Sequence, residues 1–436
     1  MVKEKRQGQV IVAAVFVLVI VALLGIVAVS ILSTESFSVV KNLQGIQALN
    51  VAEGGIQFTV ATSLAADTDF SNNADFGPVS LNPGTFSVHY LTRFRTTCWL
   101  EVTGTVGGVS RVVRARVRKG NLPSQFSDFS AYAGDPGSVG GTLTFHAASR
   151  IIGSFYYYGP IVMVNSSFPV QTGGLIDSTS IIPPPTSGIP KYYEAWEQIG
   201  TAEPVPWDNT YYDKWLNVAA NPPSPPLNNP NYNDDTLNLS GQTIWYKAFT
   251  AKGSTVITGP GTICATTGLI TISDTTRFAG GMVRLIGLNS PGNSINLNDN
   301  TSWATTAEVI ALDQLNINNS VTTPANSILY SKSSTGGRGV TVTSKAIARG
   351  SVLAPYGTVT INLNGWIRGL IYAYSLQAQG SSTQEGGGVF RGLADFLNNS
   401  MTIQNPDVLP SVLPPGVSPE STSTASFEIY SWREAY

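Results

Sequence analysis

Residues 3–34 read KEKRQGQVIVAAVFVLVIVALLGIVAVSILST, and no charged residue follows the short basic start until Glu35. From Val10 to Val29 only Gly25 interrupts the apolar residues. In an α-helix, which rises 1.5 Å per residue, about 20 apolar residues span the roughly 30 Å hydrocarbon core of a bilayer. The stretch therefore predicts one transmembrane helix over 10–29. The side chains expected to face the membrane, or the filament, include Val10, Phe16, Leu24 and Val29.

Three interpretations of this segment are open, and the first two treat it as an isolated apolar stretch. It could be a secretory signal peptide cleaved near Ala28-Val29-Ser30, although its apolar core is longer than the usual 7–15 residues. It could be an uncleaved anchor whose Lys3, Lys5 and Arg6 stay in the cytoplasm. Neither explains why the helical pattern continues well beyond the predicted span.

That continuation is the informative feature. Apolar residues recur at helical spacing through Phe37, Val40, Leu43, Ile46 and Leu49, and past Gly54-Gly55 through Ile56, Val60 and Leu64. The first proline of the chain is Pro78. A helix that is apolar all round in its first half and amphipathic in its second suits two environments.

This N-terminus resembles that of a type IV pilus minor pilin. The resemblance lies in KRQG followed by QVIVAAVFVLVIVALLG, and in NLQGIQALNVAEGGIQ (42–57), which is similar to the corresponding segment of PilX-like subunits. It implies that prepilin peptidase cleaves after Gly8 and that Gln9 becomes the methylated first residue. The implied partners are the bacterial inner membrane before assembly and the other pilins of the filament afterwards, on a pilus or cell surface outside the cell.

One position departs from the pattern of major pilins, which carry a Glu at the fifth mature position. Here that position is Ala13. A carboxylate buried without a partner in an apolar bundle is costly, so it is kept only where it meets a neighbour's terminal amine. Its absence favours a tip or low-abundance subunit over the bulk of a fibre.

Composition indicates an exported, β-rich protein after the helix. Charged residues make up 12% of the chain, about half of the usual share, and 43 glycines accompany many Ser, Thr and Asn. Residues 86–93, 97–106 and 110–118 alternate apolar and polar side chains, which predicts an antiparallel meander packed on the second half of the helix. Net charge is −2, which argues against nucleic acid as a partner. The local basic run Arg111, Arg114, Arg116, Arg118 and Lys119 is interpreted as a solvated strand face.

From Gly120 onward, short alternating runs recur every 8 to 12 residues between Gly, Asn and Ser. This spacing allows a sandwich, a barrel or a solenoid. The segment GSVLAPYGTVTINLNGWIRGLIYAYSLQAQG (350–380) resembles a repeat of the right-handed β-helix domains that follow PilX-like N-termini. We therefore expect a mainly β fold whose largest part is a right-handed parallel β-helix with roughly 22 residues per coil. The meander is expected to cap one end, and the closing strand SFEIYSW (426–432) to pair near the other.

An apparent insertion at 183–235 is rich in proline and aromatic residues. YYEAWEQ (192–198) is expected to form a short helix. Exposed rings here could bind sugars or another subunit, and the alternative is that they pack onto the flank of the solenoid. The candidate interaction aromatics are Tyr192, Tyr193, Trp196, Trp207, Tyr211, Tyr212 and Trp215.

The chain contains few residues in patterns typical of catalysis. His89 and His146 each stand in a β run without a second ligand at metal spacing, and both are interpreted as structural. Asp274, Asp299 and Asp313 are scattered acids with no motif that joins them. The weak Ca²⁺ candidate Asp67, Asp69 and Asp75 lacks the glycine and the bidentate Glu of a calcium loop. We expect no enzyme, no cofactor and no metal.

The two cysteines, Cys98 and Cys264, fall in the meander and in the solenoid. Because disulfides persist outside the cytoplasm, a bond between the two domains is one expectation. Two separate buried thiols are the other.

The predicted organisation is a leader at 1–8, a pilin helix at 9–66, a meander at 67–120, the solenoid at 121–404 and a Pro-rich strap with a final strand at 405–436. The expected function is that of a structural pilin subunit that displays the solenoid at or near a filament tip for adhesion or assembly priming, with surface glycans as candidate partners. Two alternatives stay open. One is a type II secretion pseudopilin, and the other is a membrane-anchored surface β-helix that binds or cleaves polysaccharide.

Overall fold

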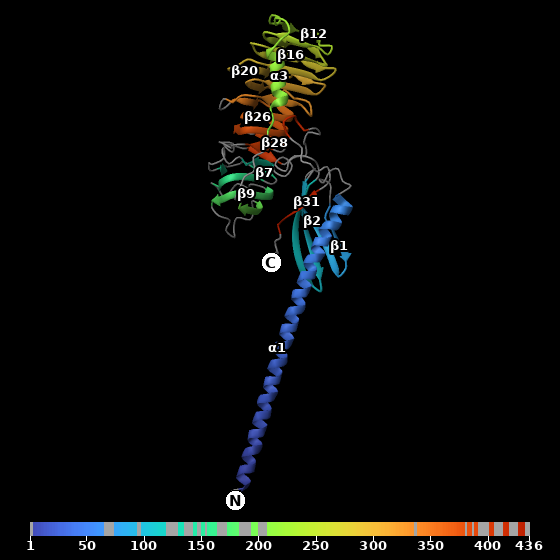
Figure 1. Ribbon diagram of the computed structural model, residues 1–436, viewed down its shortest axis with the longest axis vertical. Coiled ribbons are helices and arrows are strands. Elements are labelled where there is room, and N and C mark those ends of the chain that lie inside the picture. The colour runs from blue at the N-terminus through green and yellow to red at the C-terminus, as the bar shows by residue number, and fades with distance from the viewer. Residues whose placement is uncertain are drawn as a thin grey trace.

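The computed structural model describes residues 3–64, 74–93, 97–118, 130–134, 143–145, 150–152, 155–163, 172–182, 193–198, 207–334, 338–379, 382–385, 388–390, 401–404, 413–417 and 426–431. Within them a long helix leads into a small antiparallel sheet, and a parallel β-solenoid follows (Figure 1).

The N-terminal helix α1 (Lys3–Thr59) is continuous, and the π-helical turn η1 (Val60–Leu64) ends it. The predicted helical run to Leu64 is therefore confirmed. The first half of α1 projects away from the rest of the chain in Figure 1, because no described element packs against it. By length and composition alone, this helix could cross a membrane once.

The second half of α1 packs on an antiparallel sheet, as expected. The sheet has the order β1-β2-β3-β4-β31. Its strands are β1 (Phe76–Leu81), β2 (Gly84–Arg93), β3 (Thr97–Val106), β4 (Val109–Arg118) and β31 (Ser426–Ser431). The helix and the sheet come close together at Gly104, where a Cβ atom would lie 2.1 Å from the carbonyl oxygen of Ala48. Buried Ala52, Ile56 and Val102 complete this contact.

Two features of this sheet differ from the prediction. β1 is a strand that the sequence pattern did not reveal. The C-terminal strand β31 does not pair at the far end of the solenoid but with β4, where Ser426 stands opposite Arg118. The whole solenoid is thus an insertion between two neighbouring strands of the small sheet.

The solenoid consists of three parallel sheets, here called A, B and C, that the chain visits in turn in every coil. Sheet A contains β5 (Ala131–Ala133), β8 (Phe155–Met163), β9 (Thr172–Ile182), β10 (Tyr193–Gln198), β13 (Thr243–Tyr246), β16 (Gly261–Ala265), β19 (Val283–Gly287), β22 (Ala307–Ala311), β24 (Ile328–Ser331), β26 (Ile347–Asn362), β27 (Trp366–Gln379) and β29 (Gly388–Phe390). Several long strands bend from one sheet into another.

Sheets B and C hold the shorter strands. Sheet B contains β6 (Leu143–Phe145), β11 (Asn231–Asn233), β14 (Phe249–Lys252), β17 (Ile270–Ile272), β20 (Asn293–Leu297), β23 (Gln314–Ile317), β25 (Gly339–Val342) and the later parts of β8, β9, β26 and β27. Sheet C contains β7 (Arg150–Ile152), β12 (Thr236–Asn238), β15 (Val256–Thr258), β18 (Arg277–Ala279), β21 (Ser302–Trp303), β28 (Ser382–Glu385), β30 (Met401–Gln404) and the first parts of β26 and β27.

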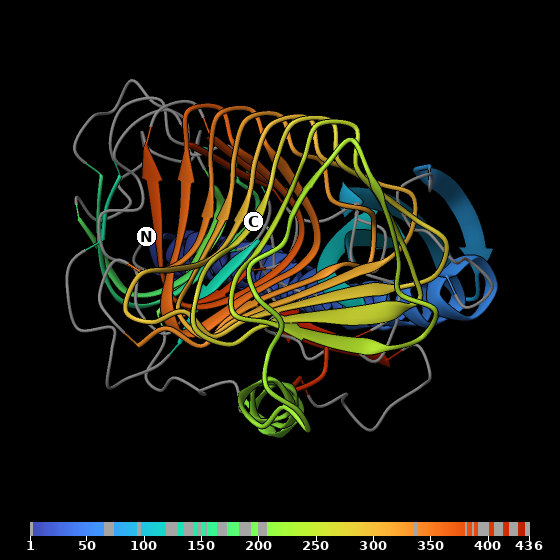
Figure 2. The ribbon, with the colours of Figure 1, turned by 90° about the horizontal axis from the view of Figure 1, so that it is seen from above.

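The coils stack in register, and Figure 2 shows them from above as a series of similar loops, each displaced from the next. In sheet B, Thr250 pairs with Thr271, 21 residues on, and Thr271 pairs with Asn296, 25 residues on. These repeats bracket the predicted length of roughly 22. Inward residues of sheet A form an aliphatic column of fully buried side chains, namely Ile263, Leu285, Val309, Leu329, Val352 and Ile371. Burial of such columns is the main favourable term for this part of the fold.

The coils do not stack in chain order. β29 pairs with β5 and β30 pairs with β7, so the last coils rest directly on the first. The chain therefore enters the solenoid between its ends, builds the end nearer the small sheet with β8, β9 and β10, and crosses to the opposite end, where β11 begins (Figure 1). It then winds back to its entry point.

The predicted insertion at 183–235 is accordingly the crossover between the two parts of the solenoid. Its described residues contain the helix α3 (Thr210–Ala220), which lies outside one side of the coils in Figure 2. The expected helix at 192–198 is wrong, because residues 193–198 form β10 and pair in parallel with β9.

Candidate functional site

The first candidate site is the exposed surface of α1. Phe16, Leu24 and Val29 are 64%, 64% and 67% exposed. Gly8, Gln9 and Val10 lie in the first turns of the helix, but their side chains are outside the described residues. Cleavage after Gly8 and methylation of Gln9 stay predictions.

Apolar exposure continues well beyond the predicted span. Leu32, Val39, Leu43 and Ile46 are 62%, 66%, 55% and 59% exposed. Their spacing of 7, 4 and 3 residues places them on one face of the helix, which we call the outer stripe. The opposite face buries Ala48 and Ala52 against the small sheet. The second half of α1 thus has two apolar faces, and within the described part of the chain only one of them is covered.

The second candidate is the outer face of sheet A, which is also apolar. Its outward column consists of Trp245, Cys264, Ile286, Ile310, Tyr330, Leu353 and Tyr372. The crossover covers this column with α3, and residues 413–417 of the Pro-rich strap lie beside it. Tyr212 donates a 2.7 Å hydrogen bond to the carbonyl oxygen of Pro415, and the Asp208 amide donates one of 3.1 Å to Gly416.

Aromatic side chains of the crossover contact this face directly. The Tyr212 and Tyr330 rings are stacked at a centroid distance of 4.0 Å, and the Trp207 and Tyr372 rings at 4.6 Å. Tyr212 is fully buried, and Trp207, Tyr211 and Trp215 are partly buried. Of the two alternatives for these four residues, packing onto the flank of the solenoid is therefore the correct one, and they do not form an exposed interaction surface. Tyr192 and the side chains of Tyr193 and Trp196 lie outside the described residues.

A buried ion pair lies beneath α3. Arg284 of β19 and Glu308 of β22 are adjacent in the sheet A register and are bonded through Nε and Oε2. Tyr211 donates a 2.7 Å hydrogen bond to Oε1 of Glu308, and the Arg284 guanidinium lies 3.5 Å from the centroid of the Trp215 ring. Burial, and then the hydrogen bond to Glu308, raises the pKa of Tyr211. Tyr211 and Trp215 of α3 thus each contact one member of an ion pair on the solenoid.

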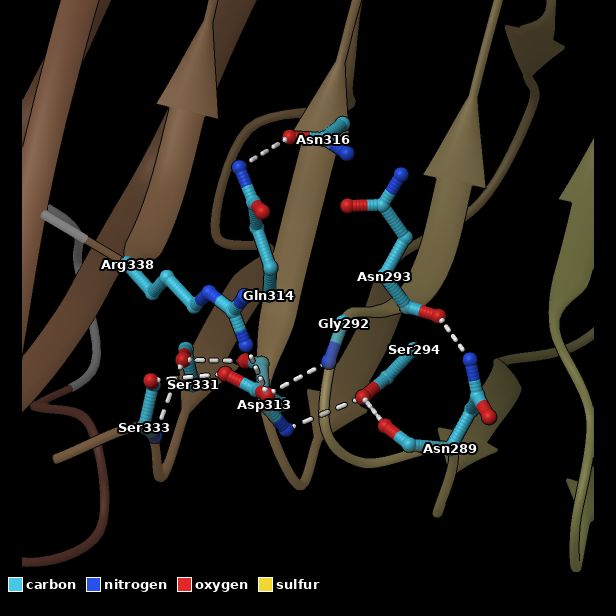
Figure 3. A network of polar contacts seen from close by, with 10 residues as sticks. All are labelled: Asn289, Gly292, Asn293, Ser294, Asp313, Gln314, Asn316, Ser331, Ser333 and Arg338. Atoms are coloured by element: carbon cyan, nitrogen blue, oxygen red, sulfur yellow. Dashed lines mark hydrogen bonds and ion pairs between the residues drawn. The ribbon is translucent and has the colours of Figure 1, made fainter. Parts of the chain in front are cut away.

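The scattered acids serve the loops of the solenoid. Asp313 is 4% exposed and accepts hydrogen bonds from the Gly292 amide and the Ser333 hydroxyl, at 2.8 and 2.7 Å, while Arg338 lies 3.2 Å from its carboxylate (Figure 3). Asp274 accepts a 2.9 Å bond from the Gly253 amide, and Asp299 one of 3.2 Å from Asn319. Each carboxylate binds a neighbouring coil, so these acids do not gather into one site.

The third candidate is the outward surface of sheet B, which sequence inspection overlooked. Its central column runs across successive coils as Thr250, Thr271, Asn296, Asn316, Thr341, Thr360 and Gln377. Two residues further along each strand stand Lys252, Ser273, Asn298, Asn318, Thr343 and Asn362, and before the column stand Gln314, Thr358 and Ser375. Thr358, Thr360 and Ser375 are buried, and the hydroxyls of Thr358 and Ser375 lie 2.7 Å apart, so the solvent-facing part of the columns is made by the other residues. We call these three columns the polar face. The alternation in LNIN (315–318) and TINLN (360–364) is the signal that could have revealed it.

The other predicted residues have structural surroundings. Asp75 accepts a 2.9 Å hydrogen bond from the Tyr90 amide and lies 2.6 Å from Nδ1 of His89, which agrees with a structural role for this histidine. Asp67, Asp69, His146 and Lys119 lie outside the described residues. Among the described residues no cluster of three or more His, Cys, Asp or Glu side chains could hold a metal ion. In the basic strand, Arg114 pairs with Glu101 at 2.8 Å.

The predicted disulfide is wrong. Cys264 is a buried free thiol on the outer face of β16, beneath the crossover, and Cys98 is buried in the core of the small sheet. The alternative of two separate buried thiols is correct. Burial raises the pKa of Cys264 to about 12.

No protein-family model and no curated protein matches the chain. Among solved structures, the competence-associated pilin ComZ from Thermus thermophilus aligns over 88% of this chain and 97% of its own, at 11% sequence identity and a TM-score of 0.22. A superposition at that TM-score supports neither a shared fold nor a shared function.

Proposed function

We propose that the chain is a pilin-like subunit, in which α1 is first a membrane anchor and then an assembly element. The observation that carries the proposal is the outer stripe. Residues 10–29 already match the thickness of a bilayer core, and Leu32 to Ile46 extend the exposed apolar surface by about 20 Å along the axis. A plain anchor has no use for this extension in water.

The occupant of the outer stripe is the α1 helix of other subunits. Spacings of 7, 4 and 3 residues are those by which helices pack at small crossing angles. The opposite face of the same segment is occupied by the small sheet through Ala48 and Ala52, so a neighbour must approach from outside. Assembly would bury in a helical bundle the surface that the bilayer leaves uncovered.

The processing step follows the same logic. Cleavage after Gly8 would remove Lys3, Lys5 and Arg6, which hold the helix in the membrane orientation. Ala13 offers no carboxylate to a neighbour's terminal amine, which supports a rare or terminal position in the filament. The solenoid would then be displayed outside the cell. The role is structural and needs no catalysis.

Mass spectrometry of the mature N-terminus tests the proposal. The expected first residue is a methylated Gln9, and a Gly8→Arg variant is expected to keep Met1. An intact Met1 in the native protein, or a start at Ile31, would overturn it. Sheared-filament preparations then separate the alternatives, since a pilus subunit is recovered with extracellular fibres and a plain surface protein stays with the membrane.

A further inference from the structure

The polar face is almost free of charge. Its three columns contain one ionisable side chain, Lys252 of β14, in the coil next to that of β11 at the end far from the small sheet. The cation beside its centre, Arg338, is paired with buried Asp313 (Figure 3). A surface that serves only solubility usually carries both signs of charge. A polyanion such as nucleic acid needs several cations at once, so the ligand for such a face is neutral.

The side chains of the polar face are also held in place. Asn316 donates a 2.8 Å hydrogen bond to Asn296, and Gln314 donates to Asn316 and Thr341 at 3.0 and 3.3 Å. Asn318 donates a 2.8 Å bond to Asn298. A side-chain amide has two N–H donors and an oxygen with two lone pairs, so each retains capacity toward solvent. Prior ordering lowers the entropy lost when a ligand binds.

A second observation points to the kind of ligand. Tyr356 and Tyr374 are 39% and 43% exposed, whereas the other described tyrosines of the solenoid coils are buried or partly buried. Both lie at the corner between sheets A and B, between the register pairs Ala354 with Ala373 and Thr358 with Ser375. They therefore border the polar face in neighbouring coils. An exposed ring with a hydroxyl group combines an apolar surface with a polar edge.

We propose that the polar face, with Tyr356 and Tyr374 at its border, binds a neutral polysaccharide. Sugars present many hydroxyl groups without charge, together with apolar C–H faces that stack on aromatic rings. The hydroxyls and amides of the columns would form hydrogen bonds with the sugar hydroxyl groups, and the two tyrosine rings would contact the apolar C–H faces. Because the rungs repeat at about 4.8 Å, a polymer that lies along the axis makes the same contacts repeatedly. Affinity is thus expected to rise with chain length.

This inference extends the proposed function by naming the ligand class of the displayed solenoid. The two fail separately, because the polar face lies on sheet B and filament assembly depends on α1. A chain that does not assemble can still bind a glycan, and a chain with an altered polar face can still assemble.

The test uses the full chain in detergent micelles and an array of neutral, amino-sugar, uronic-acid and sulfated oligosaccharides. Thr271→Lys/Thr341→Lys places two long charged side chains in the central column, and Tyr374→Ala removes one border ring. Thr258→Lys, a partly buried threonine of sheet C, is the matched control. Thermal unfolding of every variant establishes that it is folded.

Binding of a neutral glycan is expected, with affinity reduced at least tenfold by the double lysine variant and severalfold by Tyr374→Ala, and unchanged by Thr258→Lys. If the lysine variant does not fold, Tyr374→Ala and a length series of the bound neutral glycan decide instead. The proposal is overturned by absence of binding to every neutral glycan, by binding confined to acidic or sulfated ones, or by equal losses in the polar-face and control variants.

Discussion

Tyr212 of the crossover helix α3 lies face to face with Tyr330 of β24, with an interplanar angle of 4°. The two residues are far apart in the chain, and the contact fixes the crossover against the coils that it connects. Tyr212 is fully buried and also bonds to Pro415 of the strap. One side chain thus joins three segments of the solenoid domain.

Replacing this anchor should be costly. Tyr212→Ala is expected to lower the free energy of unfolding by about 3 to 5 kcal/mol, because it leaves a cavity and removes a buried ring. Lys214→Ala, an exposed residue of the same helix, should change it by no more than about 0.5 kcal/mol. Denaturant unfolding in detergent measures both. Equal effects would contradict the anchoring role.

The ion pair under α3 should behave as a unit. Glu308→Leu or Arg284→Met alone is expected to cost about 3 to 5 kcal/mol, since each leaves its partner buried without a counter-charge. The double variant Arg284→Met/Glu308→Leu should recover most of the loss, because an apolar pair needs no desolvated charge. A double-mutant cycle measures the coupling. Additive losses would show that the pair does not act as one element.

The outer stripe should govern assembly without affecting the fold. Leu43→Lys is expected to abolish incorporation into filaments, because a desolvated ammonium in a helical bundle is costly. The side chain is 55% exposed, so unfolding of the small sheet should not change. Asn50→Lys, an exposed polar position on the same face beyond the stripe, is the control. Immunoblots of sheared filaments measure how much of each variant is incorporated. Normal incorporation of Leu43→Lys would refute the packing of the outer stripe in a helical bundle.

Cys264 should be unreactive in the folded protein. Its pKa rises from 9.0 to about 12 on burial, so the neutral thiol is the form that the fold favours. The stability linked to this group is therefore complete below the unfolded pKa and is lost as pH rises through about 12. Iodoacetamide at pH 8 is expected to label Cys264 only after denaturation, as followed by peptide mass spectrometry. Rapid labelling of the native protein would contradict this environment.

The sequence pattern predicted the individual helices and strands better than it predicted which strands pair with one another. Continuous helical spacing to Leu64 and strict alternation around Thr358–Asn362 specify a helix and a coil because both are local. Pairing between coils is not local. Every coil offers the same kind of parallel edge, so nothing in the spacing indicates that β30 should rest on β7.

The crossover shows the same limit from another side. Residues 193–198 have the composition of a helix but take the strand conformation that the open edge of β9 imposes. In α3, buried Tyr212, Leu216 and Ala219 do stand at helical spacing, but the prolines around them concealed the pattern. The four described aromatic residues pack on an apolar sheet face that only the fold creates, so the sequence could name them without settling their role.

The pairing of β31 with β4 also determines how the molecule bears tension. The solenoid joins the small sheet through β4, which continues covalently toward α1, and through β31, whose pairing with β4 holds it in the sheet. Ser426 and Arg118 stand at the same end, so a pull on the solenoid draws β31 along its own axis. Antiparallel hydrogen bonds run perpendicular to the strands, and such a pull loads them in shear, all together and not one after another. Strand β31 is thus a mechanical clamp between the solenoid and the small sheet that packs on α1.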